Sequence, residues 1–206
     1  MEKKKFKVVI TGGPSGGKTT LIEALQKDFS KQISVAPEAA SILYKGGWPR
    51  KKTNMARRHT QRAILFSQRE LEDMILASTS HPVILCDRGS LDSLAYWPSS
   101  EDSFFEEIQS NRQQELARYE WVLHMDTAPQ DSYDGEDPIR TENYEEAAEL
   151  NEKIKGAWSG HPRRFIIGQQ SDFFAKLQIA KTIIEMIVDH HDYDSINDYL
   201  NKAMRS

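Results

Sequence analysis

The stretch TGGPSGGKTT, residues 11–20, constrains the fold of this chain more than any other part of the sequence. It places four glycines, a proline and a lysine in ten positions, directly after the apolar run Val8–Ile10. Gly12–Thr19 fits the pattern G-x-x-x-x-G-K-[ST] in full, and a helical pattern follows it. A strand, a glycine-rich turn and a helix start in this order are typical of a loop that wraps around phosphate groups. The alternative is a glycine-rich turn with a chance lysine.

The residues of this loop have separate expected tasks. Glycines let backbone N–H groups point at phosphate oxygens, and the helix start directs its positive dipole end at the same place. Lys18 is expected to reach the β and γ phosphates, and Thr19 to offer a hydroxyl to Mg2+. The sequence therefore predicts a site for ATP or GTP with Mg2+, formed by Gly12, Gly13, Pro14, Ser15, Gly16, Gly17, Lys18, Thr19 and Thr20.

Short apolar runs separated by longer helical patterns indicate an α/β fold with parallel strands. The expected strands are Phe6–Thr11, Ile33–Ala36, Val83–Cys86, Trp121–Met125 and Phe165–Ile167. Helices that cover the sheet are expected over Thr19–Phe29, Thr60–Ser78 and Asp172–Val188. Right-handed crossovers place the tips of all strands along one edge, where open parallel sheets bind ligands. With 206 residues and no internal repeat or linker, we expect one domain over residues 1–206.

Two segments, residues 43–59 and 126–142, interrupt this scheme and are predicted to lack regular structure. The first contains Gly46–Pro49, and the second contains two prolines, a glycine and four aspartates. Both follow expected strands at the ligand-binding edge, where loops of this length are usually functional or mobile. We interpret residues 43–59 as a substrate loop and residues 126–142 as a lid.

Asp87 and Arg88 directly follow the third apolar run. An acid at the end of such a strand lies near the Mg2+ in many phosphate-binding folds of this type. The neighbouring cation could hold an anionic substrate group or stabilise charge on a transferred phosphoryl group. The alternative is a strand-end turn that these two residues form with Gly89.

Glu38 and Arg140 complete the set of candidate catalytic residues. Glu38 ends the second apolar run, where it could accept the proton of an attacking hydroxyl or hold a metal-bound water. It could equally serve as the cap or first-turn acid of a helix that starts at Ala39. Arg140 could bring a positive charge onto the phosphates when a lid closes, or lie in a solvated loop.

Composition narrows the classes of function and the location. A net charge of −4 argues against a protein that mainly coats nucleic acid. The single cysteine, Cys86, lies in an apolar run and is expected in the core, which favours a reducing compartment, most simply the cytoplasm. Too few apolar residues follow the basic start for a signal peptide or membrane span. The basic residues between positions 50 and 58 form either a solvated loop or a surface for an acidic substrate or membrane headgroup.

Six blocks carry a resemblance that extends from Lys7 to about Val188. They are ITGGPSGGKTTLIEAL, VAPEAA, VILCDRGSLDSLAYW, RYEWVLHMD, DPIRTE and GHPRRFII, in this order. The chain resembles the NadR-like family of P-loop AAA-type ATP- or GTP-binding proteins, which are related in fold to nucleoside and nucleotide kinases. The resemblance implies a three-layer α/β/α P-loop NTPase fold, with five parallel strands and the P-loop strand in the centre.

The resemblance also implies roles for the candidate residues. Asp87 and Arg88 would take the place of the kinase Asp-Arg pair, Glu38 that of the base for the phosphorylated hydroxyl, and Arg140 that of a lid arginine. Kinases of nucleoside monophosphates usually carry several lid arginines, whereas this segment has one.

The combined residues lead to one function and two alternatives. We expect a Mg2+-dependent phosphotransferase that moves the γ phosphoryl group of ATP, in preference to GTP, to a small hydroxyl-bearing acceptor such as a nucleoside. The first alternative is a nucleotide-hydrolysing switch that binds a protein or membrane partner through the two irregular segments. The second is a nucleotide-binding module without turnover.

Overall fold

A parallel five-stranded sheet organises the chain. The computed structural model describes residues 5–133, 143–170 and 172–205. The strands have the order β2-β3-β1-β4-β5, and every neighbouring pair is parallel. Their bounds are β1 (Phe6–Thr11), β2 (Ile33–Ala36), β3 (Val83–Asp87), β4 (Trp121–Met125) and β5 (Arg164–Ile167). All five expected strands are confirmed, and the strand that precedes the P-loop is central.

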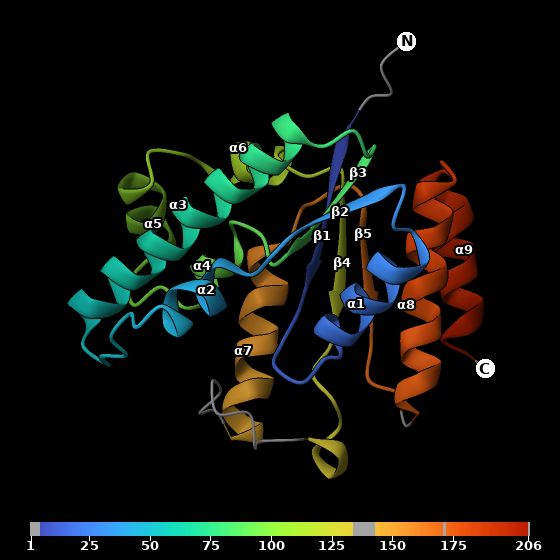
Figure 1. Cartoon of the computed structure of the whole chain (residues 1–206). Coiled ribbons are helices and arrows are strands. Elements are labelled where there is room, and N and C mark those ends of the chain that lie inside the picture. Colours follow the sequence, from blue (N-terminus) through green and yellow to red (C-terminus); the bar gives the residue numbers. More distant parts are fainter. Residues whose placement is uncertain (1–4, 134–142, 171, 206) are drawn as a thin grey trace.

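Helices cover both faces of this sheet (Figure 1). In the described residues, the α-helices are α1 (Lys18–Asp28), α2 (Ala39–Lys45), α3 (Asn54–Ser78), α4 (Asp92–Ala95), α5 (Glu101–Glu107), α6 (Arg112–Ala117), α7 (Tyr144–Ala157), α8 (Phe173–Val188) and α9 (Tyr193–Ala203). A short 3-10 turn, η1 (Gln130–Ser132), follows β4. Figure 1 shows α1, α8 and α9 on one side of the sheet and α3, α5 and α7 on the other. The three-layer α/β/α architecture is therefore as expected.

Buried side chains along β1 pack alternately against the two helical layers. Val8 and Ile10 pack with residues of α1, α8 and α9, whereas Val9 packs with residues of α3, α5 and α7. Successive side chains of a strand point to opposite faces, so a central strand buried on both faces reads as a continuous apolar run. Cys86 is buried in the second of these cores, as expected, and burial raises the pKa of its thiol well above the usual range.

The prediction that residues 43–59 lack regular structure is wrong at both ends. Helix α2 continues to Lys45, and α3 begins at Asn54 rather than at Thr60. The hydroxyl of Thr53 accepts a hydrogen bond from the N–H of Ala56 and caps α3. The first turns of α3 are exposed and charged, so they carry no apolar stripe that would have indicated a helix.

The second irregular segment is described only in part. Residues 126–129 have no regular structure, and η1 follows them. Residues 134–142, and with them Arg140, lie outside the described residues. In the described parts of the chain, no helix is long and apolar enough to cross a membrane.

Candidate active site

The P-loop follows a tight course between β1 and α1. Gly12 and Gly17 have φ angles of 124° and 87°, and Ser15 has a φ angle of 54°. These left-handed conformations turn the backbone sharply, and glycine adopts them without steric cost. A Cβ atom at Gly12 would lie 2.0 Å from the carbonyl oxygen of Met125, so no larger residue fits there. The loop and the first turn of α1 contain all the predicted nucleotide-binding residues: Gly12, Gly13, Pro14, Ser15, Gly16, Gly17, Lys18, Thr19 and Thr20.

Lys18 lies inside this turn. It is the first residue of α1, and its side chain is only 4% exposed. Its ammonium group donates a hydrogen bond to the carbonyl oxygen of Gly13, at 2.5 Å. The next two residues, Thr19 and Thr20, are exposed, so their hydroxyls are open to a ligand at the helix start. A buried cation beside two accessible hydroxyls fits an anionic ligand that carries a metal ion.

Glu38 faces the P-loop rim rather than capping a helix. It occupies the N-cap position of α2, but its side chain makes no capping hydrogen bond. The first N–H of α2, that of Ala39, is instead bound by the side-chain oxygen of Gln68, at 3.0 Å. One carboxylate oxygen of Glu38 lies 3.4 Å from Nε of Arg88, and the other accepts a hydrogen bond from the hydroxyl of Ser41.

Arg88 connects Glu38 to the P-loop. It has a φ angle of 76°, and its backbone N–H donates to the carbonyl oxygen of Ile10 in β1. The guanidinium group donates to the carbonyl oxygen of Gly12 and lies 3.5 Å from a carboxylate oxygen of Asp92. Arg88 is therefore held by an acid on either side, with its charge over the first residue of the P-loop.

Asp87 lies at the end of β3, next to Ile10 in the parallel register. Burial raises the pKa of its carboxyl. The positive charges of Arg88 and Lys18 act against this rise. The structure thus brings together four of the five candidate catalytic residues, Lys18, Glu38, Asp87 and Arg88.

Asp92 is a site residue that the sequence did not reveal. The residue is 5% exposed, and one carboxylate oxygen accepts hydrogen bonds from the hydroxyl of Thr11 and from the indole N–H of Trp158, both at 2.6 Å. The other oxygen faces Arg88. A position four residues after Arg88 at a helix start is the only sequence signal for this contact, and it is a weak one.

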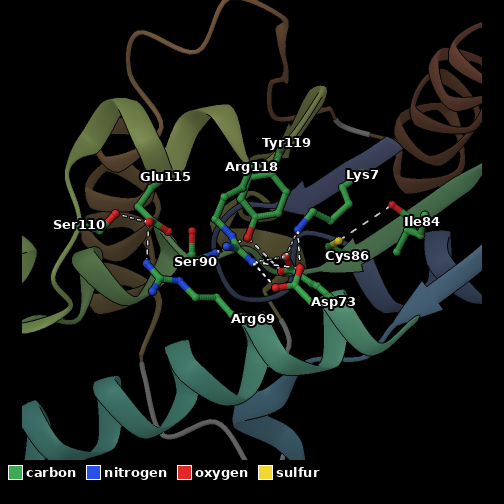
Figure 2. A network of polar contacts seen from close by, with 11 residues as sticks. Lys7, Arg69, Asp73, Ile84, Cys86, Ser90, Ser110, Glu115, Arg118 and Tyr119 are labelled. Carbon is green, nitrogen blue, oxygen red and sulfur yellow. Dashed lines mark hydrogen bonds and ion pairs between the residues drawn. The ribbon is translucent and has the colours of Figure 1, made fainter. Parts of the chain in front are cut away.

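A buried polar network supports the turn that follows Arg88 (Figure 2). The hydroxyl of Tyr119 accepts a hydrogen bond from the backbone N–H of Ser90, at 2.8 Å, and donates one to Glu72, at 2.9 Å. Lys7 forms an ion pair with the other carboxylate oxygen of Glu72, at 3.0 Å. Burial raises the pKa of Glu72, although Lys7 and the hydroxyl of Tyr119 act against it. Both hydrogen-bonding functions of the tyrosine hydroxyl are therefore used in the interior.

Removal of that hydroxyl in Tyr119→Phe is expected to lower the free energy of unfolding by about 1–3 kcal/mol. The substitution leaves the Ser90 N–H without its acceptor and Glu72 without one donor, and both groups are buried. Urea denaturation measures the loss. Tyr199→Phe, in a half-buried tyrosine packed against the opposite core, is the matched control and should change stability by less than about 0.5 kcal/mol. Equal stability of the two variants would contradict a structural role for the Tyr119 hydroxyl.

The basic residues near the start of α3 lie at a different place. A cavity of about 260 Å³ is lined by α3 and α5 residues, namely Asn54, Met55, Arg58, His59, Arg62 and Glu107. Arg58 and Arg62 both pair with Glu107. None of the lining residues belongs to the P-loop or to the pair Asp87–Arg88, so this cavity is separate from the candidate active site.

The family follows from a comparison with known protein families. A family model described as "AAA domain" matches residues 7–176. The chain belongs to the AAA domain family. No curated protein matches this AAA domain.

Solved structures share the fold of this AAA domain. Deoxyadenosine kinase from M. mycoides with bound dATP is 12% identical, has a TM-score of 0.60, and is matched over 87% of this chain and 99% of the kinase chain. Thymidylate kinase from Candida albicans is 14% identical, has a TM-score of 0.59, and is matched over 91% of this chain and 94% of the kinase chain. The NadR protein in complex with NAD and AMP-PNP is 14% identical, has a TM-score of 0.65, and is matched over 92% of this chain and 51% of the NadR chain.

These comparisons confirm the resemblance to NadR-like proteins and to the fold of nucleoside and nucleotide kinases. This AAA domain spans about half the length of the NadR chain. At such low identities, the shared property is the fold.

Proposed function

We propose that this protein is a Mg2+-dependent phosphotransferase that moves the γ phosphoryl group of ATP to the hydroxyl of a small, nucleoside-like acceptor. The observation that carries the proposal is the position of Glu38 and Arg88. The two side chains pair at 3.4 Å, and Arg88 also contacts the carbonyl of Gly12 in the P-loop. A carboxylate and a guanidinium group on the rim of a phosphate-binding loop supply a proton acceptor and a fixed positive charge where phosphoryl transfer needs them.

In the proposed step, the acceptor hydroxyl attacks the γ phosphorus of ATP. A bond forms between the acceptor oxygen and this phosphorus, and the bond from the phosphorus to the β–γ bridging oxygen breaks, so that ADP leaves. Glu38 accepts the hydroxyl proton. Lys18 and the P-loop N–H groups hold the phosphates, and Arg88 stabilises the charge that develops on the transferred group.

The residues present fit a Mg2+ ion that is held jointly with the nucleotide. The exposed hydroxyl of Thr19 and the carboxyl of Asp87, whose pKa is raised by burial, would be its protein ligands. The part of the chain that the structure describes has no cluster of three or more His, Cys, Asp or Glu side chains suited to a metal. Water and phosphate oxygens would supply the other ligands of Mg2+. The ion would neutralise phosphate charge.

The relatives in fold support the class of reaction. Two of them are named as kinases of a nucleoside and a nucleotide, and a third was solved with AMP-PNP. ATP is therefore proposed as the donor in preference to GTP, and Arg140 is retained as the proposed lid arginine on sequence grounds alone.

A screen of acceptors tests the proposal. Purified protein with ATP and Mg2+ is incubated with nucleosides, nucleotides and other small hydroxyl compounds, and both ADP and phosphorylated product are measured. We expect ADP to form in amounts equal to a phosphorylated product for one class of acceptor. ATP hydrolysis that no acceptor changes would favour the nucleotide-dependent switch, and tight ATP binding without any turnover would favour a binding module.

A further inference from the structure

A second buried network lies behind the P-loop, on the side of α7. Its central residue is Asn151, which is 5% exposed. The side-chain oxygen of Asn151 accepts a hydrogen bond from the backbone N–H of Gly13, at 2.9 Å. A helix that is remote in sequence therefore binds the phosphate-binding loop directly.

The surroundings fix the orientation of the Asn151 amide. The N–H of Gly13 can only donate, so the amide oxygen must face it. Nε2 of His124 lies 3.0 Å from this oxygen and 3.2 Å from a carboxylate oxygen of Asp126, and since both are acceptors, Nε2 carries the proton. The amide nitrogen of Asn151 donates to the same oxygen of Asp126, at 2.8 Å. The position thus requires an acceptor and a donor on one short side chain, which asparagine provides.

The carboxylate of Asp126 holds the side chains of His124 and Asn151 in this orientation. Burial raises the pKa of its carboxyl, but hydrogen bonds from His124, Asn151 and Lys155 outweigh burial and hold the pKa well below the usual range. Lys155 lies 3.0 Å from the carboxylate, and the amine of Lys176 donates to the backbone carbonyl of Asp126. The carboxylate therefore remains an acceptor at neutral pH.

Gly13 is held from two directions. A Cβ atom at this residue would lie 2.0 Å from Oγ1 of Thr127 and 2.8 Å from Cβ of Asn151, so the backbone is pressed against both. Its N–H is bound by Asn151, and its carbonyl oxygen is bound by the ammonium group of Lys18. The hydrogen bond to Asn151 consequently holds Gly13, whose carbonyl oxygen binds the ammonium group of Lys18, in place.

We propose that Asn151 is a positioning residue of the phosphate site, which holds the P-loop in its binding conformation through the N–H of Gly13. The inference rests on the proposed function in one respect, namely that the P-loop binds the phosphates of a nucleotide. Without Asn151, the N–H of Gly13 loses its acceptor and the first peptide units of the loop are less constrained, so part of the loop must be ordered again when a ligand binds.

The test is Asn151→Ala, with the binding of ATP and of inorganic tripolyphosphate measured by calorimetry. We expect the dissociation constants of both ligands to rise by about tenfold, the scale of one lost buried hydrogen bond. Both should change alike because Asn151 acts on the loop that binds phosphates. Hydrogen exchange at the Gly13 amide, measured by NMR, should be slow in the wild type and fast in the variant.

Asn143→Ala is the matched control on the same helix. Asn143 caps α7 by accepting a hydrogen bond from the N–H of Glu146. Loss of this side chain weakens the start of α7 but removes no contact to the P-loop. A general weakening of α7 would therefore affect both variants, whereas the proposed role affects ligand binding in Asn151→Ala alone. Asn151→Leu, which is close to asparagine in size but offers no oxygen to the N–H of Gly13, supplies the same comparison if the alanine variant does not fold.

The outcomes separate this inference from the proposed function. The inference is wrong, and the proposed function stands, if the wild type binds ATP and the dissociation constant of Asn151→Ala for ATP is within about twofold of the wild-type value, with an equally protected Gly13 amide. Equal losses in Asn151→Ala and Asn143→Ala would also overturn it. If the wild type binds neither ATP nor tripolyphosphate, the proposed function itself fails.

Discussion

Lys18→Ala is expected to lower the rate of ATP turnover by about 10³-fold, the scale of a fixed charge lost from a phosphoryl-transfer site. Lys18 is 4% exposed and its ammonium group lies within the P-loop, so bulk water cannot take over the stabilisation of phosphate charge that this group is expected to supply. We expect the variant to remain folded, because the hydrogen bond to the carbonyl oxygen of Gly13 lies in the loop, outside both apolar cores. Turnover is measured as ADP formation with the acceptor found in the screen, and stability by thermal unfolding.

Lys27→Ala provides the control for this prediction. Lys27 lies in the last turn of the same helix, α1, and is exposed. It should leave turnover within about twofold of the wild type, since exposed charges far from the site act only weakly on it. A Lys18→Ala protein that turns over ATP at nearly the wild-type rate would contradict the assignment of the phosphate site.

Glu38→Gln is expected to lower acceptor phosphorylation by about 10²- to 10⁴-fold while leaving ATP affinity nearly unchanged. Glutamine keeps the shape of the side chain, and its single amide oxygen can face Arg88 while its amide nitrogen donates to the hydroxyl of Ser41, but it cannot take a proton from the acceptor hydroxyl. Initial rates at saturating ATP and acceptor measure the loss, and calorimetry measures ATP binding.

The location of Glu38 allows its effect on acceptor phosphorylation to be separated from its effect on ATP affinity. Its carboxylate contacts Arg88 and Ser41, whereas the phosphates are proposed to bind to the P-loop residues. Glu23→Gln, at an exposed position of α1, is the matched control and should change neither quantity. Undiminished acceptor phosphorylation by Glu38→Gln would remove the general-base role and leave Glu38 as a partner that positions Arg88.

The strands and the candidate site were predictable from local patterns to different extents. Each strand is a short apolar run bounded by polar residues, and this pattern depends only on neighbours in sequence. The motif Gly12–Thr19 likewise carries its own context. Because the carboxyl ends of parallel strands share one edge, the acids at the ends of the second and third apolar runs could be placed near the P-loop from the sequence.

The residues that support the site could not be predicted in this way. Asp92, Tyr119 and Asn151 act through contacts with segments that are remote in sequence, and their immediate neighbours form no motif. A buried asparagine on a helix and an exposed one look alike in a single sequence. The start of α3 was missed for a related reason, since its first turns bury little apolar surface.

Trp158 offers an optical consequence of the contacts around Asp92. Its indole is fully buried, and its N–H donates to the carboxylate whose other oxygen faces Arg88. Any ligand that draws Arg88 towards a phosphate changes the electric field at this ring, so the fluorescence emission of Trp158 should shift when nucleotide or acceptor binds. Comparison with Trp158→Phe isolates its signal from that of the other tryptophans. Trp158 is thus an intrinsic fluorophore that is connected to the candidate catalytic arginine through the carboxylate of Asp92. We expect its emission to report ligand binding without an added label.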